Sequence, residues 1–351
     1  MKEISIDTAL QKGFPLIDVR SPSEFRVDTI PGAVNIPILN DKEREQVGIC
    51  YRNQGSRQAK ALGFKLVAEK LPRIIEDIRA YDTPVIFCWR GGFRSKSVCA
   101  LLDMLEANAF RLTGGYKSYR KKVNDFFDAL GNTIPVEFIV IHGLTGVGKT
   151  EVLHELARMG ETVVDLERYA NNRGSVFGAV GLGSQPSQKK FESSIFSTLY
   201  GNTDRPVFVE CESRRIGRIV IPENMFRWMQ EGRNVLIYDT IDRRIRRIIQ
   251  EYLQPTTDLE ELLRPIENLK ARLGNEKVQE LKELLEKQRF DTVVEYLLLS
   301  YYDPLYGYPS GPSSEYDLCL ANADSKNTAA VISEFFNGPP GEVDKIGGVR
   351  K

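Results

Sequence analysis

Long apolar runs, histidines and closely spaced cysteine pairs are all scarce in this sequence of 351 residues. No apolar run approaches the roughly 20 residues that a membrane-spanning helix needs, so a membrane protein is not expected. With two histidines and no Cys-x-x-C pair, a zinc site built from cysteine and histidine is not expected either. No signal peptide is evident, and we therefore expect a cytoplasmic protein whose five cysteines are reduced thiols.

Charge of one sign is not in excess, since 48 basic residues balance 48 acidic ones. A net charge of zero neither supports nor excludes a nucleic-acid partner, and it means that any basic surface must be local. The composition is that of an ordinary globular protein, with 42% hydrophobic and 27% charged residues. A chain of this length predicts about two domains, each able to bury its own core.

The most informative stretch begins at a cysteine that follows an apolar run at 84–87. It reads Cys88-Trp89-Arg90-Gly91-Gly92-Phe93-Arg94-Ser95 and leads into an amphipathic segment at 95–107. The two glycines allow the backbone to curl so that its N–H groups point inward. The helix N-terminus and the side chains of Arg90 and Arg94 add positive charge, which favours a thiolate and a bound anion. The stretch predicts that Cys88 is a nucleophile in an anion-binding loop rather than a buried structural cysteine.

A second motif has the pattern G-x-x-x-x-G-K-T between a predicted strand at 138–141 and a predicted helix at 151–159. It reads Gly143-Leu144-Thr145-Gly146-Val147-Gly148-Lys149-Thr150. In such a P-loop the backbone amides cradle a di- or triphosphate, Lys149 reaches the terminal phosphate and Thr150 can ligate Mg²⁺. The motif predicts a polyphosphate ligand without specifying which one.

Alternating strand and helix patterns divide the chain near 132–135 and predict two α/β domains with parallel sheets. We expect the first domain at 1–131, the second at 136–337 and a loose tail at 338–351. In the first domain we predict strands at 16–19, 34–36, 85–87 and 110–112 and helices at 58–80 and 116–129. In the second we predict strands at 138–141, 162–164, 207–209 and 235–238, a charged helical segment at about 242–300 that includes an N-cap at Thr257, a short apolar run after Tyr316 and a last helix at 328–336.

The first domain resembles a rhodanese domain. The resemblance is carried by Ile17-Asp18-Val19-Arg20-Ser21-Pro22-Ser23-Glu24-Phe25, by Ile30-Pro31-Gly32-Ala33-Val34-Asn35-Ile36-Pro37 and by Leu112-Thr113-Gly114-Gly115-Tyr116. In that family the cysteine of the strand–loop–helix, here Cys88, carries a persulfide or its selenium counterpart. Asp18 and Arg20, at a strand end, are expected to brace the active loop through charge-assisted hydrogen bonds. The implied architecture is a rhodanese-like α/β domain followed by a P-loop NTPase-like domain with a helical extension.

The active loop departs from the commonest rhodaneses, whose loop usually has six residues. Its Cys-x5-Arg-Ser pattern is the spacing of tyrosine-phosphatase loops, and a wider loop suits a tetrahedral oxyanion. One alternative function is therefore a Cys-x5-Arg phosphatase fused to a nucleotide-binding, kinase-like domain, and another is a non-catalytic binding module regulated by a nucleotide. Phe87 replaces the usual phosphatase histidine and no general-acid aspartate can be assigned, which disfavours the first alternative. The intact Cys88 disfavours the second.

The order and fusion of these motifs resemble the tRNA 2-selenouridine synthase family, over nearly the whole chain to about Tyr306. Further matching segments are Val47-Gly48-Ile49-Cys50-Tyr51, Gln54-Gly55-Ser56, Asp165-Leu166-Glu167, Arg173-Gly174-Ser175-Val176-Phe177-Gly178, Glu210-Cys211-Glu212-Ser213-Arg214-Arg215-Ile216-Gly217 and Tyr301-Tyr302-Asp303-Pro304-Leu305-Tyr306. The resemblance implies a transferase that acts on wobble 2-thiouridine of certain tRNAs. It would attach a geranyl group from geranyl diphosphate to the sulfur and then replace the S-geranyl group with selenium from selenophosphate.

The same resemblance implies residue roles. Cys88 would accept selenium as a selanylsulfide, while Arg90 and Arg94 would hold the phosphate of selenophosphate. We expect the P-loop to hold geranyl diphosphate, with an NTP as the alternative ligand. The sequence specifies neither the tRNAs nor the oligomeric state.

Two acidic residues are candidates for the P-loop ligand site. Asp165 follows a predicted strand and either ligates Mg²⁺ or caps the next segment. Glu210 ends another predicted strand and is a second candidate acid, with an ion pair to Arg214 or Arg215 as the alternative.

Two further clusters could contact RNA. Arginines at 243, 244, 246 and 247 predict either an RNA-phosphate contact or a solvated helix face. Tyrosines at 301, 302, 306 and 308 could stack bases, line a prenyl pocket or pack in the core.

Overall fold

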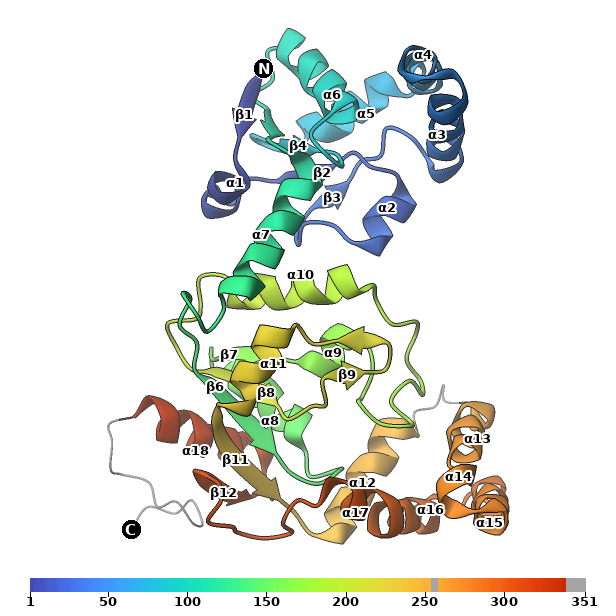
Figure 1. Cartoon of the computed structure of the whole chain (residues 1–351), viewed down its shortest axis with the longest axis vertical. Helices are drawn as coiled ribbons and strands as arrows, with labels where there is room; N and C mark the ends of the chain where they lie inside the picture. The colour runs from blue at the N-terminus through green and yellow to red at the C-terminus, as the bar shows by residue number, and fades with distance from the viewer. Residues whose placement is uncertain (254–257, 339–351) are drawn as a thin grey trace. The chain divides into compact units, whose positions relative to one another are not determined.

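The computed structural model describes residues 1–253 and 258–338, and it contains two compact units (Figure 1). The first unit comprises 1–128 together with 192–197, and the second comprises 129–191 and the described chain from 198 onward. The expected N-cap at Thr257 and the expected loose tail beyond Gly338 lie outside the described residues.

The first unit is built on a five-stranded sheet in which all neighbouring strands are parallel. Its order is β1-β5-β4-β2-β3, with β1 at Lys2–Ile4, β2 at Leu16–Asp18, β3 at Val34–Asn35, β4 at Val85–Phe87 and β5 at Phe110–Leu112. The four predicted strands are confirmed. The sequence did not predict β1, because two of its three residues are charged and offer no apolar run.

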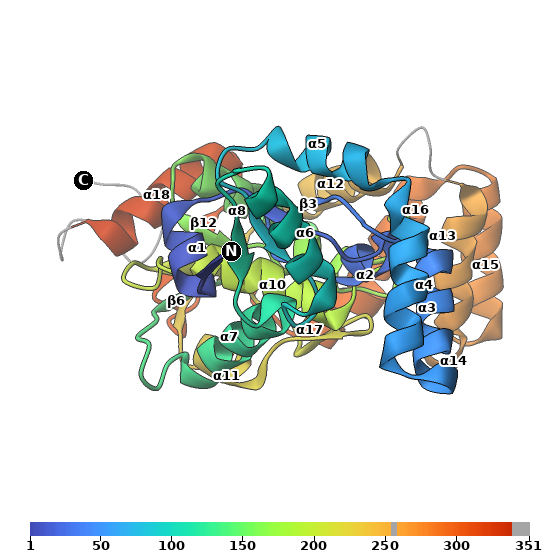
Figure 2. The same ribbon diagram turned by 90° about the horizontal axis from the view of Figure 1, so that it is seen from above.

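Seven helices surround this sheet in the described part of the first unit. They are α1 (Ile6–Lys12), α2 (Pro22–Val27), α3 (Asp41–Gln54), α4 (Ser56–Ala68), α5 (Leu71–Arg79), α6 (Phe93–Met104) and α7 (Gly115–Ala129). The prediction of one helix at 58–80 is wrong, because the chain turns between α4 and α5 and Pro72 occupies the first turn of α5, where proline is favoured. The unpredicted α3 pairs with α4 as a hairpin, and Figure 2 shows the two side by side.

The second unit contains a second five-stranded parallel sheet. Its order is β12-β11-β6-β8-β7, with β6 at Phe138–His142, β7 at Thr162–Val164, β8 at Val207–Glu210, β11 at Arg233–Tyr238 and β12 at Leu318–Ala321. A small antiparallel hairpin is formed by β9 (Arg215–Ile216) and β10 (Ile219–Val220). The strand β6 lies in the middle of the sheet, which explains why it reads as a continuous apolar run. The two-domain α/β fold predicted from the sequence is thus confirmed.

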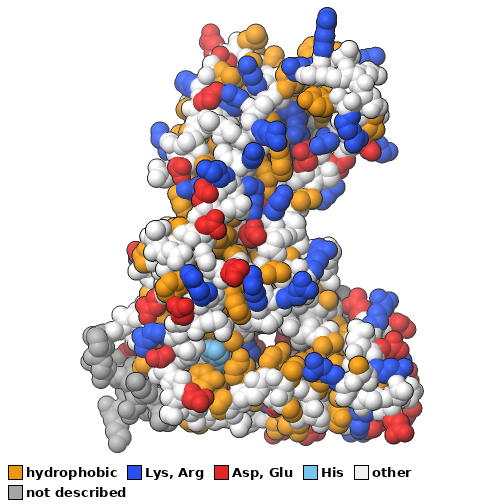
Figure 3. Space-filling model, viewed as in Figure 1, with side chains coloured by type: hydrophobic (Ala, Val, Ile, Leu, Met, Phe, Trp, Pro, Cys, Tyr) orange, Lys and Arg blue, Asp and Glu red, His pale blue; other side chains and the backbone are white. Residues whose placement is uncertain are grey.

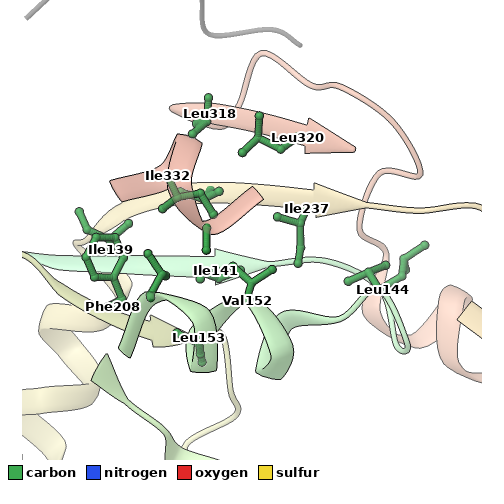
Figure 4. Packing of buried hydrophobic residues seen from close by; sticks show 14 residues of the cluster. Ile139, Ile141, Leu144, Val152, Leu153, Phe208, Ile237, Leu318, Leu320 and Ile332 are labelled. Atoms are coloured by element: carbon green, nitrogen blue, oxygen red, sulfur yellow. The ribbon is translucent and has the colours of Figure 1, made fainter. Parts of the chain in front are cut away.

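The helices of the second unit divide into those that cover the sheet and those that form the extension. The first group is α8 (Lys149–Arg158), α9 (Leu166–Ala170), α11 (Glu223–Gln230) and α18 (Ser325–Asn337), while α10 (Gln188–Leu199) belongs to both units because 192–197 group with the first. The second group is α12 (Ile241–Tyr252), α13 (Leu259–Asn268), α14 (Lys270–Leu273), α15 (Asn275–Glu286), α16 (Phe290–Leu297), the π-helix η1 (Leu298–Tyr302) and α17 (Asp303–Tyr306). Figure 4 shows Val152 and Leu153 of α8 and Ile332 of α18 packed against Ile141 and Ile237 of the sheet.

Charged side chains of both signs are interspersed on the face shown in Figure 3. This distribution agrees with the balanced composition and marks no dominant basic surface on that face. Among the helices of 1–253 and 258–338, none is both long and apolar enough to cross a membrane.

A buried arginine ties the helical extension to the P-loop. The Arg244 guanidinium of α12 pairs with both carboxylate oxygens of Asp303 in α17, at 2.9 and 2.5 Å, and its Nε donates to the carbonyl oxygen of Thr145 at 2.8 Å. Arg244 is only 3% exposed, so loss of one partner would leave a buried charge without compensation.

We therefore expect Arg244→Ala to lower the free energy of unfolding of the second unit by about 3–5 kcal/mol. The matched control is Arg246→Ala, because Arg246 lies on the exposed face of the same helix. That control should change stability by no more than about 0.5 kcal/mol. Urea unfolding of the full chain measures both values, and equal effects would contradict the assignment of Arg244 as a buried anchor.

Candidate functional site

The thiol of Cys88 lies between the end of β4 and the first turn of α6. Cys88 directly follows β4 and is 3% exposed, and its Sγ is 3.2 Å from Oγ of Ser95. Gly92 is the N-cap residue of α6, so the thiol faces the end of the helix whose N–H groups lack helical partners. This is the strand–loop–helix position predicted for a nucleophile beside an anion.

The segment that follows β5 donates backbone hydrogen bonds to the Cys88 loop. The amide of Tyr116 donates to the carbonyl oxygen of Cys88 at 2.9 Å, and the amide of Lys117 donates to that of Trp89 at 2.9 Å. Gly115 has a φ of +61°, and a Cβ there would lie 2.3 Å from the carbonyl oxygen of Cys88 and 2.3 Å from the amide nitrogen of Gly91. Only glycine permits this approach of two backbones.

Asp18 and Arg20 form a buried ion pair next to this loop. Nη2 of Arg20 is 2.6 Å from Oδ2 of Asp18 and also donates to the carbonyl oxygen of Asp28 at 2.7 Å. The Arg20 guanidinium lies 4.1 Å from the centre of the Tyr116 ring. The predicted bracing by hydrogen bonds therefore needs correction, because the pair supports the loop through the ring of Tyr116.

The two arginines of the loop have different surroundings. Arg94 forms a two-point contact with the carboxylate of Glu24, at 2.6 and 3.2 Å, and is 21% exposed. Glu24 also accepts from the amide of Ser21, so it fixes the N-terminus of α2 and orients Arg94 at the same time. Arg90 is exposed. A cleft of about 990 Å³ opens beside Arg94, and the α3–α4 hairpin and Phe93 line much of it.

Substitution of Gly115 should disrupt the Cys88 loop. Gly115→Ala adds a methyl group against two backbones, so we expect it to destabilise the first unit and to abolish the chemistry of Cys88. Gly13→Ala is the matched control, since Gly13 has the same φ of +61° and no atom lies within 4 Å of the point that its Cβ would occupy.

Gly13→Ala should cost about 1–2 kcal/mol, the penalty of a left-handed backbone alone. Gly115→Ala should cost about 2 kcal/mol more, because overpacking is added. Denaturant unfolding of both variants measures the difference, and equal costs would show that the clash is relieved.

The P-loop connects β6 to α8. Three of its carbonyl oxygens accept hydrogen bonds from side chains that lie elsewhere in the sequence. Thr145 O accepts from Arg244, Gly146 O accepts from Arg247 at 3.3 Å, and Val147 O accepts from Nδ2 of Asn322 at 2.7 Å. The amides of the first turn of α8 have no helical partners and remain available to a phosphate. Nζ of Lys149 donates to Gly143 O at 2.9 Å, which places it across the loop.

These contacts correct the prediction for the arginine cluster. Arg244 and Arg247 are part of the support of the P-loop, and Arg247 pairs in addition with the buried Asp239 at 2.6 Å. Arg243 pairs with the other oxygen of Asp239 at 2.8 Å. The helix is therefore not a wholly solvated face, and a contact with RNA through the exposed Arg246 stays a prediction.

Three carboxylates converge on the P-loop cleft. Glu167, Glu210 and Glu212 each place an oxygen within 4.8 Å of the others, and Oε2 of Glu210 is buried without a hydrogen-bond partner among the described residues. Burial, followed by the charge of Glu212, raises the pKa of Glu167 to about 8. Burial and then the charges of its two neighbours raise the pKa of Glu210, and burial also raises that of Glu212.

The sequence analysis identified only some of the acidic residues that line the P-loop cleft. Glu210 lies in the cleft, and the alternative ion pair with Arg214 or Arg215 is wrong, because Arg214 pairs with Glu223 and Glu210 accepts from the amide of Glu167. Asp165 caps α9, accepting from the amide of Arg168 at 2.9 Å, and its other oxygen contacts His154. Glu167 and Glu212 were missed, although each stands two residues after a candidate acid.

The carboxylate cluster fits a divalent cation. Hard cations such as Mg²⁺ take oxygen ligands, and the unpartnered oxygen of Glu210 supplies one that no proton donor of the described chain satisfies. Glu210, Glu167 and Glu212 would hold the ion on one side of the cleft, and Thr150 lines the same cleft. The cleft has a volume of about 700 Å³, and Lys149, Arg173 and Tyr306 also line it.

A bound cation should stabilise the protein through Glu210. At a Mg²⁺ concentration of about 100 times Kd, the stabilisation is about 2.7 kcal/mol. We expect Glu210→Gln to remove this increment in the melting temperature without lowering the temperature measured in EDTA, since it also removes a buried charge.

Asp165→Asn is the control for this experiment. Asn still caps α9, so any change in the melting temperature, from the altered contact with His154, should be equal with and without Mg²⁺. If Asp165→Asn abolishes the increment and Glu210→Gln does not, Asp165 rather than Glu210 is the ligand of the cation.

Two family models and full-length relatives match this chain. Residues 5–122 match the rhodanese-like domain, and residues 136–335 match the family described as tRNA 2-selenouridine synthase AAA domain. A protein of Pseudomonas putida named tRNA 2-selenouridine synthase is 33% identical over 336 residues, covering 86% of this chain and 89% of its own. A protein of the same name from Bordetella petrii is 34% identical and covers 93% of each chain. Among solved structures, the N-terminal domain of a Clostridium difficile 630 protein is 40% identical, covers 35% of this chain and 98% of its own, and has a TM-score of 0.33.

The fold and the two loops define a class in which a rhodanese domain with an intact cysteine is joined to a P-loop domain. Within that class, the matches to both domains and to full-length relatives are specific. The chain belongs to the tRNA 2-selenouridine synthase family. The phosphatase–kinase alternative is not favoured by these matches.

Proposed function

We propose that this protein is a tRNA-modifying transferase that converts wobble 2-thiouridine to 2-selenouridine in two steps. Geranyl diphosphate first alkylates the sulfur, and selenium from selenophosphate then replaces the S-geranyl group. The names of the relatives support the tRNA substrate and the selenated product. The observation that carries the two-step scheme is the presence, in one chain, of a thiol loop at Cys88 and a separate P-loop at Lys149.

Alkylation has a chemical reason. The sulfur of 2-thiouridine has thiolate character and is a poor leaving group from C2. Once it carries a geranyl group it is a thioether on an electron-poor pyrimidine carbon, and geranylthiolate leaves more readily. A selenium nucleophile can then displace it without any change in the oxidation state of the carbon.

The first step is assigned to the P-loop. The allylic C–O bond of geranyl diphosphate breaks, a C–S bond forms to the nucleobase, and the diphosphate leaves with the electron pair. Lys149 and the first-turn amides of α8 would hold that diphosphate and stabilise its growing charge. A bound Mg²⁺ would add further charge neutralisation, and Glu210, Glu167 and Glu212 would hold it.

The second step balances without an oxidant or reductant when selenophosphate is the nucleophile. Its selenium attacks C2, a C–Se bond forms, the C–S bond breaks and geranylthiolate departs. The Se–P bond must then break with its electron pair moving to selenium. Attack of Cys88 at selenium would instead expel phosphite and leave a Se–S bond that needs an added thiol to release it.

We therefore propose that Cys88 attacks phosphorus, and not selenium, in this step. Its Sγ attacks the phosphorus of the Se-phosphorylated intermediate, the electron pair of the Se–P bond returns to selenium, and water later frees phosphate from the cysteine. The Cys-x5-Arg spacing of the loop, with Arg94 oriented by Glu24, suits a tetrahedral phosphoryl group. The selanylsulfide implied by the rhodanese resemblance is the competing intermediate.

Single substitutions should separate the two steps. Lys149→Ala should lower geranylation of 2-thiouridine tRNA on the order of 10²-fold or more, yet it should still convert tRNA supplied in S-geranylated form. Cys88→Ser should geranylate normally and fail to yield 2-selenouridine. Nucleoside mass spectrometry of the tRNA measures both products, and Cys50→Ser, which alters a thiol far from either loop in the sequence, is the control.

Two results would contradict these assignments. Normal geranylation by Lys149→Ala, or a requirement for ATP hydrolysis, would make the P-loop a nucleotide site. We expect Cys88 to carry a phosphoryl group that resists a thiol reductant. If Cys88 instead carries selenium that the reductant releases, the intermediate is the selanylsulfide.

A further inference from the structure

A narrow apolar cavity adjoins the P-loop cleft in the second unit. Its volume is about 70 Å³, and it shares Thr145, Ser175, Ile248 and Tyr252 with the cleft that holds Lys149. The cavity lies among the helical extension, with walls from α12, α13, α15, α16 and η1. A ligand that begins at the P-loop therefore has a direct apolar continuation.

The chemistry of the walls selects against a nucleoside. Leu262 and Ile266 of α13 and Val293 and Leu297 of α16 present hydrocarbon to the cavity, and the hydroxyl-bearing side chains belong to a few wall residues, most of them shared with the cleft. A ribose or a base would lose its hydrogen bonds to water there, whereas a hydrocarbon chain gains from the transfer.

We propose that this cavity binds the isoprenoid chain of the prenyl diphosphate whose diphosphate group occupies the P-loop. The inference rests on the proposed function and adds to it the site that selects the length of the chain. Thr145 belongs to the P-loop and lines both spaces, so it marks the point where the diphosphate ends and the chain begins.

Two local features hold the mouth of the cavity in shape. The Arg173 guanidinium lies 4.7 Å from the centre of the Tyr252 ring and pairs with Glu251 at 2.5 Å, which fixes that wall of the cavity. On another side, α16 continues into the π-helix η1, which places Leu298 and Tyr302 at the wall. Single π-turns are rare and often occur at functional sites.

The dimensions of the cavity should determine which donor is used. The test compares dimethylallyl, geranyl and farnesyl diphosphates, which differ by one isoprene unit each, as donors to 2-thiouridine tRNA. Val294 is half-buried on α16 and lines the cavity, so Val294→Phe should narrow it. We expect kcat/KM for geranyl and farnesyl diphosphates to fall about tenfold, with little change for dimethylallyl diphosphate.

A widening variant tests the opposite direction. Phe290 also lines the cavity, and Phe290→Ala should raise the ratio of farnesyl to geranyl transfer about tenfold. Glu295→Phe is the matched control, because Glu295 lies on the same helix and is exposed. Binding of inorganic pyrophosphate, measured by calorimetry, should be the same in all variants and shows that the P-loop remains folded.

The outcomes distinguish this inference from the proposed function. If pyrophosphate binds normally but neither Val294→Phe nor Phe290→Ala changes the preference for chain length, the cavity does not hold the chain, while the assignment of the P-loop stands. If Val294→Phe weakens ATP binding and leaves all three donors unchanged, the cavity belongs to a nucleoside and the inference is overturned. If pyrophosphate and geranyl diphosphate do not bind the wild-type protein at all, the proposed function fails together with the inference.

Discussion

Both loops obey one constraint: a backbone that presents its N–H groups to an anion must have its carbonyl groups satisfied elsewhere. In the P-loop, the side chains of Arg244, Arg247 and Asn322 donate to three successive carbonyl groups. In the Cys88 loop, backbone amides at Tyr116 and Lys117 do the same. In both loops the donors come from other segments of the chain: α12 and Asn322 for the P-loop, and the segment after β5 for the Cys88 loop.

This constraint explains why arginines of the second unit are held inside the fold. Arg244 and Arg247 lie in a cluster whose density suggests nucleic-acid binding, yet their guanidinium groups are held by Asp303, Asp239 and loop carbonyl groups. Bidentate, planar arginine suits such positions better than lysine, since it can satisfy a carboxylate and a carbonyl group together. The number of arginines in this segment therefore exceeds the number of guanidinium groups that remain accessible to a partner.

The sequence predicted the features that are local and missed those that depend on contacts across the chain. Both loops were found because strand, loop and helix are consecutive in each, and the buried central strands read as apolar runs. The contact of Glu24 with Arg94 joins residues far apart in the sequence, and no periodic pattern indicates it. The sequence left Asp165 as either a metal ligand or a cap, and only the observed contact with the amide of Arg168 shows the cap.

One side of the P-loop is lined by acidic residues and the other by hydrocarbon. This difference affects how a prenyl diphosphate would bind. On one side, burial raises the pKa values of Glu167, Glu210 and Glu212, so these groups favour a proton or a cation over bare charge. On the other side lies hydrocarbon. A diphosphate brought alone toward Lys149 would find no positive charge on the side of the acids, whereas a divalent cation held by the acids would add one. We therefore expect the cation and the donor to bind with positive coupling, each raising the affinity for the other by the same factor.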